Sequence, residues 1–138
     1  MKIEGFCSPL DVIARPEEPL ADAASRMRFN DVGCVPVIDQ GQLAGILTER
    51  DLTRAVADGA DGRRVVVADY MTSEPIVVDP ETDAIDASRI MIDAGVRHLP
   101  ILKDGRLVGV VSMRDIVAEL LWSRVWQAAP AGNGEVQP

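Results

Sequence analysis

The stretch that decides the fold is Gly45-Ile46-Leu47-Thr48-Glu49-Arg50-Asp51, and a second version of it follows as Gly109-Val110-Val111-Ser112-Met113-Arg114-Asp115. In each version an apolar run ends in a hydroxyl residue, and an aspartate stands three positions later. Working outward from these motifs, residues 12–52 align without a gap with residues 76–116, and twelve of the 41 positions are identical. The chain is therefore an internal duplication.

Each half is predicted to contain a strand, a helix, a two-stranded hairpin and a second helix. Residues 75–79 form a short β-branched run typical of a strand. From Leu20 the apolar residues follow the period of a helix, and the second half repeats this pattern behind Asp83, a predicted N-cap. Gly41 and Gly105 lie between apolar runs, where a hairpin needs a positive φ. Because a half of about 55 residues is marginal alone, we expect an α+β fold of two pseudo-symmetric β-α-β-β-α repeats packed sheet to sheet.

The repeat also suggests where the chain divides. We expect residues 1–57 to form the first repeat, residues 58–66 a linker, and residues 67–127 the second repeat with a C-terminal helix. The linker is rich in glycine and charge, which is typical of a solvated loop. Residues 128–138 are rich in Ala, Gly and Pro, and we expect a disordered tail there.

Composition excludes several classes of protein. The 138 residues contain 14 Lys and Arg against 22 Asp and Glu, so the net charge is -8. This balance disfavours binding to nucleic acid, which requires clustered cations. Two cysteines and one histidine are too few for a disulfide scaffold or a thiolate zinc site. We therefore predict no intrinsic metal and no nucleic-acid partner.

The sequence also offers little for catalysis or export. It contains no Ser-His-Asp set, no P-loop and no cluster of metal ligands, so we predict that the protein is not an enzyme. The N-terminus carries an early acid, Glu4, and no apolar stretch follows it, so no signal peptide is expected. With no run of about 18 apolar residues, the expected location is the cytoplasm, away from membranes.

The two motifs carry the chemistry that the sequence offers. A helix that begins directly after a strand exposes unpaired N–H groups, which favour an anion such as phosphate. An aspartate in the first turn can accept two hydrogen bonds from a vicinal diol, such as that of ribose. The same pattern is also a capping box with a purely structural role, although its recurrence favours a site. Arg50 and Arg114 recur too, either as solvated helix residues or as phosphate contacts.

The paired motifs, together with segments 96–101 and 67–72, resemble the cystathionine-β-synthase (CBS) domain, and two tandem copies resemble a CBS pair, or Bateman module. The resemblance covers about residues 7–120. It implies a non-catalytic regulatory module that binds an adenosyl ligand (AMP, ADP, ATP or S-adenosylmethionine) in clefts between the repeats. Binding would change the conformation or the interaction with a regulated protein that the sequence does not identify. Mg²⁺ is expected only together with ATP.

The resemblance implies a ligand-binding role for ten residues, to which the recurring arginines are added. These are Asp51, Asp115, Thr48 and Ser112 for ribose or phosphate, Arg97 and His98 for phosphate, Ile76, Val77, Val78 and Ile13 beside adenine, and Arg50 and Arg114 as further phosphate contacts. The two halves are unequal, because the first has Gly33-Cys34 where the second has Arg97-His98. We therefore expect unequal affinities, with the phosphates directed toward Arg97 and His98.

The last predicted helix supplies a candidate interface. Trp122 and Trp126 lie four positions apart on one face of residues 116–126, where they could cover the module's own core or contact a second copy. The resemblance favours a homodimer formed through the helices of the CBS pair. The competing hypothesis is a scaffold or interaction protein that binds no ligand, acts through dimerisation and uses the motifs only as helix caps.

Overall fold

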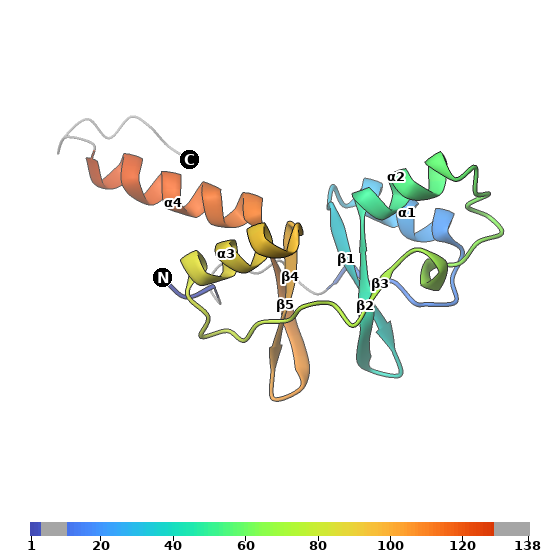
Figure 1. Cartoon of the computed structure of the whole chain (residues 1–138), viewed down its shortest axis with the longest axis horizontal. Coiled ribbons are helices and arrows are strands. Elements are labelled where there is room, and N and C mark those ends of the chain that lie inside the picture. The colour runs from blue at the N-terminus through green and yellow to red at the C-terminus, as the bar shows by residue number, and fades with distance from the viewer. Residues whose placement is uncertain (4–10, 129–138) are drawn as a thin grey trace.

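Each half of the chain folds into a hairpin flanked by two helices. The computed structural model describes residues 1–3 and 11–128, with side chains as far as Ser123. The elements are α1 (Leu20–Phe29), β1 (Cys34–Asp39), β2 (Gln42–Thr48) and α2 (Glu49–Ala57), then a short 3-10 helix (Val67–Asp69) and β3 (Thr72–Ser73), then α3 (Ala84–Ala94), β4 (His98–Lys103), β5 (Arg106–Ser112) and α4 (Met113–Ala128). The hairpins lie side by side in the middle, with the helices of each repeat on its outer side (Figure 1).

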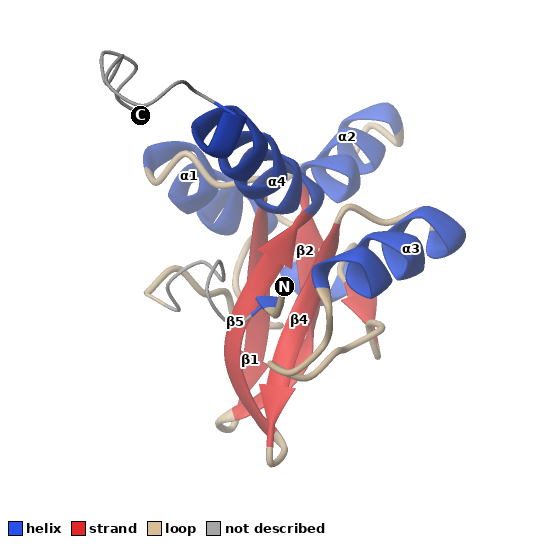
Figure 2. Cartoon of the chain, turned by 90° about the vertical axis from the view of Figure 1, so that its left-hand side faces the viewer, coloured by secondary structure: helices blue, strands red, loops and turns tan. Residues whose placement is uncertain are grey.

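The two hairpins have the same register. Cys34 pairs with Thr48 in β1 and β2, and His98 pairs with Ser112 in β4 and β5, both antiparallel. The long axes of the two hairpins are roughly aligned, and the helices lie toward one end of them (Figure 2). Between the hairpins, β2 contacts β5. The predicted α+β fold of two related repeats is thus confirmed.

The strand predicted at residues 75–79 is shorter than expected. Only Val78 forms a bridge, to Ile101, through hydrogen bonds of 3.0 Å and 2.8 Å to the flanking residues of β4. The equivalent Ala14 forms the same bridge to Val37. Prolines at both ends, Pro75 and Pro80, lack an N–H and restrict the preceding backbone, so the ladder does not extend.

Each repeat completes its core with a segment from outside its own hairpin and helices. Val67, which follows the linker, is fully buried in the core of the first repeat, and Ile3 is fully buried in the core of the second. The backbone confirms this exchange, because the N–H of Leu20 donates to Val65 (3.0 Å) and that of Ala84 donates to Met1 (2.7 Å). The two lead-in segments are thus exchanged between the repeats.

The linker packs against α1. The N–H of Ala21 donates to the carbonyl of Gly62 at 2.9 Å, and Arg63 forms an ion pair with Asp22 at 2.8 Å. Of the tail expected at residues 128–138, Ala128 ends α4 and the rest lies outside the described residues.

Gly45, the first residue of the first motif, is required by the close approach of β3. A Cβ at this position would lie 2.4 Å from the carbonyl oxygen of Thr72 and 3.1 Å from the sulfur of Met71. Because a backbone oxygen cannot move as a flexible side chain can, the glycine allows β3 to pair with β2. This pairing brings the chain between the repeats onto the first sheet.

We expect Gly45→Ala to lower the free energy of unfolding by about 1–3 kcal/mol, the usual effect of overpacking. Urea unfolding of the purified protein measures it. Gly33→Ala is the matched control, because a Cβ there would meet the Glu49 side chain at an ordinary 3.5 Å; its effect should stay within about 0.5 kcal/mol. Equal effects of the two substitutions would contradict the role assigned to Gly45.

Candidate functional site

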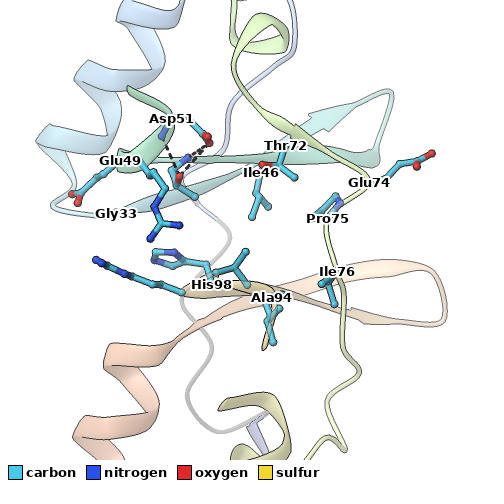
Figure 3. Close-up of a pocket in the computed structure, with 15 residues that line it drawn as sticks. Gly33, Ile46, Glu49, Asp51, Thr72, Glu74, Pro75, Ile76, Ala94 and His98 are labelled. Carbon is cyan, nitrogen blue, oxygen red and sulfur yellow. Dashed lines mark hydrogen bonds between the residues drawn. The ribbon is translucent and has the colours of Figure 1, made fainter. Parts of the chain in front are cut away.

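A pocket of about 290 Å³ opens between the two repeats, and both repeats line it. The side chains converge on it from above and below in Figure 3. The first repeat contributes the end of β2 and the start of α2, and the second contributes the chain before Ile76 and the turn from α3 to β4. The residues that matter for binding are Ile46, Thr48, Glu49, Arg50 and Asp51 on one side and Glu74, Pro75, Ile76, Ala94, Val96, Arg97 and His98 on the other.

Thr48 and Asp51 form a complete capping box at the start of α2. One carboxylate oxygen of Asp51, Oδ2, accepts from the Thr48 N–H at 2.9 Å and from the Thr48 hydroxyl at 3.1 Å. The Thr48 oxygen accepts in turn from the Asp51 N–H at 3.4 Å. The box satisfies helix N–H groups while it holds both side chains at the pocket. The structural and the binding interpretations of the motif are therefore compatible.

The other carboxylate oxygen of Asp51 is paired with an arginine. Arg54 Nη2 donates to Asp51 Oδ1 at 2.9 Å and to the backbone oxygen of Tyr70 at 2.9 Å. The guanidinium also lies 6.0 Å from the centroid of the Tyr70 ring, within the range of a cation–π contact. Arg54 thus ties the first motif to the chain that connects the repeats.

The charges around the pocket nearly cancel. Arg97 is exposed, and Arg50 donates from Nη1 to the carbonyl of Gly95 at 2.8 Å. Glu49 and Glu74 also belong to the lining and form no ion pair with any described residue, although the Glu74 carboxylate points outward from the rim (Figure 3). Two free acids therefore oppose the two arginines, so the pocket is not a strongly positive site.

His98 is half-buried on the side of the second repeat. Burial lowers the pKa of its imidazole below the usual 6.5; the charges of Asp115 and Glu49 act in the opposite direction, and Arg97 acts with burial. The imidazole is therefore mainly neutral at neutral pH. Its counterpart Cys34 has a pKa raised to about 12 by burial and by the charge of Asp51, so this thiol stays protonated.

The second motif has the same box but lies outside this pocket. The N–H of Ser112 donates to Asp115 Oδ2 at 3.3 Å, and the N–H of Asp115 donates to Ser112 Oγ at 3.0 Å. Ala118 stands where Arg54 stands in the first repeat. Within the described part of the chain, Oδ1 of Asp115 accepts no hydrogen bond. The two motifs are therefore alike in backbone and unlike in what surrounds their carboxylates.

The structure brings half of the sequence-predicted site residues together. Thr48, Arg50, Asp51, Ile76, Arg97 and His98 line the pocket, whereas Ile13, Val77, Val78, Ser112, Arg114 and Asp115 do not. Val78 is buried in the second core. Sequence reasoning missed Arg54 and Glu74. Only Arg54 had a signal, because an arginine three positions after a helical aspartate can pair with it.

Neither a metal site nor a membrane span emerges from the described residues. Over residues 1–3 and 11–128, no three His, Cys, Asp or Glu side chains are grouped as metal ligands. None of the helices described is long and apolar enough to cross a membrane.

The chain matches the family model of the CBS domain twice, over residues 7–58 and 67–121. Among curated proteins it is similar to the CBS domain-containing protein YhcV of Bacillus subtilis, with 38% identity over 102 residues that make up 73% of this chain and 72% of that protein.

Solved structures agree on the fold. The structure of CBSX2 in complex with AMP has a TM-score of 0.73 at 27% identity and covers 89% of this chain and 98% of that one. The CBS domain pair of protein MJ0100, in complex with 5-methylthioadenosine and S-adenosyl-L-methionine, has a TM-score of 0.80 and covers 90% and 98%. At 21% identity, the second comparison supports the fold alone.

We expect His98 to make the stability of the unliganded protein depend on pH. Because its pKa is lowered in the folded state, the unfolded chain binds the proton first as the pH falls. The stabilisation is complete above a pH of about 6.5 and is lost as the pH falls through the folded pKa. In urea unfolding across this range, wild type should lose more free energy than His98→Gln, and parallel curves would contradict the assignment.

Proposed function

Since the chain belongs to the CBS-domain family, we propose that it is a non-catalytic regulatory module that binds an adenosyl ligand (AMP, ADP, ATP or S-adenosylmethionine) between its repeats. The observation that carries the proposal is the pocket itself, where a box with an aspartate from one repeat faces Arg97 and His98 of the other. The AMP bound by the similar CBSX2 supports this ligand class.

The lining suggests how such a ligand would lie. Ile76 would pack against adenine, Thr48 and Asp51 would contact the ribose, and Arg97 with His98 would meet a phosphate; all five line the pocket. The volume of about 290 Å³ is at the lower end for small-molecule sites, roughly 300–1,000 Å³. Because Glu49 also faces the pocket, a single phosphate fits it better than three. Among the nucleotides we therefore favour AMP, and Mg²⁺ would enter only with ATP.

Regulation would follow from the divided lining. A ligand that contacts both repeats stabilises the arrangement in which its contacts are made together, and it thereby shifts the population of conformations. A regulated protein would recognise that arrangement. Ser112, Arg114 and Asp115, with Ile13, remain candidates for a weaker second cleft.

We expect AMP to bind the wild-type protein with a micromolar dissociation constant by calorimetry. Arg97→Ala should weaken AMP binding about tenfold or more, since a hydrogen bond to a charged group contributes roughly 1.5–3 kcal/mol. Adenosine, which lacks the phosphate, should bind both proteins alike.

Arg106→Ala is the matched control, because Arg106 is also exposed but begins β5 at the other end of the hairpin, outside the pocket. If neither AMP, ADP, ATP nor S-adenosylmethionine produced heat or raised the melting temperature, the ligand-binding proposal would be wrong.

A second proposal concerns self-association, which the scaffold alternative requires. Each helix exposes a large apolar residue: Phe29 on α1 (90% exposed), Val56 on α2 (78%), Ile92 on α3 (71%) and Leu121 on α4 (59%). Scattered singly, exposed apolar residues need no partner, so the homodimer through the helices rests on the family resemblance, and these side chains are the ones it would cover. Trp122 is half-buried on α4, and the side chain of Trp126 lies outside the described residues.

We expect the protein to sediment as a dimer at about micromolar concentrations, and Phe29→Asp with Val56→Asp to shift it toward monomer. Arg28→Asp, an exposed substitution on the same helix, controls for added charge. A monomer in the wild-type protein would contradict the interface. A dimer whose melting temperature no adenosyl ligand raises would favour the scaffold alternative.

A further inference from the structure

Arg54 occupies one of the acceptor positions that a ribose would need at Asp51. The Asp51 side chain is only 7% exposed, and the Arg54 side chain that covers its outer oxygen is 57% exposed. Asp51 is nevertheless part of the pocket lining. The carboxylate therefore lies at the wall of the pocket with an arginine of the same helix bound to it.

The acceptor capacity of Asp51 can be counted. A carboxylate offers about four lone-pair positions, two on each oxygen. Oδ2 accepts from the N–H and from the hydroxyl of Thr48, and Oδ1 accepts from Arg54. About one position remains, whereas a vicinal diol donates two hydrogen bonds. While Arg54 stays bound, Asp51 can therefore accept a hydrogen bond from one ribose hydroxyl. It can accept from both hydroxyls only when Arg54 is displaced.

The second repeat shows what the first would be without this arginine. Asp115 accepts one hydrogen bond, from the Ser112 N–H at 3.3 Å, and its Oδ1 accepts none from the described residues. Ala118 at the equivalent position cannot donate. The free Oδ1 of Asp115 reflects the missing arginine, and its Oδ2 is less occupied because the Thr48 hydroxyl donates to Asp51 whereas the Ser112 hydroxyl forms no such bond to Asp115 among the described residues.

We propose that Arg54 is a specificity-determining residue that competes with the ligand's ribose for Asp51 and so limits how well the pocket distinguishes a ribose from a deoxyribose. The proposal rests on the adenosyl-binding function above. Arg54 donates to Asp51 and Tyr70 from the same nitrogen, so the ribose competes with a side chain that also holds the connecting chain. Because the Arg54 side chain is largely exposed, its guanidinium can move into solvent when the ribose displaces it from Asp51.

The test compares the affinities of AMP and 2′-deoxy-AMP by calorimetry. In wild type the two should differ little, because only one hydroxyl finds an acceptor. In Arg54→Ala the ratio of the two dissociation constants should increase about tenfold, since the freed oxygen can accept the second hydroxyl. Arg89→Ala is the matched control, because Arg89 also pairs with an aspartate three positions away, at 3.8 Å on α3, and should leave the ratio unchanged.

A second variant separates this effect from a general change in charge. In Asp51→Asn with Arg54→Ala, the gain in ratio should disappear, because the amide keeps the shape of Asp51 but loses acceptors. If wild type binds AMP and Arg54→Ala leaves the ratio unchanged, this inference is wrong and the proposed function stands. If wild type binds neither nucleotide, the inference is wrong; if it also binds no ADP, ATP or S-adenosylmethionine, the proposed function fails with it.

Discussion

The structure depends on one constraint: neither repeat can close its hydrophobic core with its own residues. Val67 fills the first core and Ile3 fills the second, both fully buried. A half of this size is only marginally stable alone, and the exchanged segments join the two halves through burial of apolar side chains. The pseudo-symmetry of the hairpins and bridges follows from the duplicated sequence, and the reciprocal packing joins the two copies.

The same exchange builds the pocket. The segment that carries Val67 into the first core continues into β3, which pairs with β2 at Gly45, and then into Pro75 and Ile76 at the pocket wall. In the same segment, the carbonyl of Tyr70 accepts a hydrogen bond from Arg54, which also donates to Asp51. The connecting chain is thus a structural part of the site, and a ligand that contacts the first motif contacts the junction of the repeats as well.

Much of this architecture could be predicted from local patterns. The two capping boxes and the cap at Asp83 follow from local spacing, because each joins residues two or three positions apart. The duplication follows from comparing residues 12–52 with residues 76–116. Which motif would face Arg97 and His98 could not be predicted, because the packing of one repeat on the other decides it. The sequence also could not predict that residues 75–79 form only one bridge, at Val78. A β-branched run predicts a strand, but the length of the strand depends on the backbone groups available to pair with it.

The exchanged lead-in segments also bear on how such a chain could be divided. Gly59 lies in an exposed turn and has a φ of +72°. A break there would leave Ile3 on the N-terminal piece, although the core of the second repeat needs it. It would leave Val67 on the C-terminal piece, although the core of the first repeat needs it. Each piece would be incomplete without the other, and reassembly would restore both cores together. The fold is thus suited to fragment complementation, in which two separately made polypeptides fold only when they bind each other.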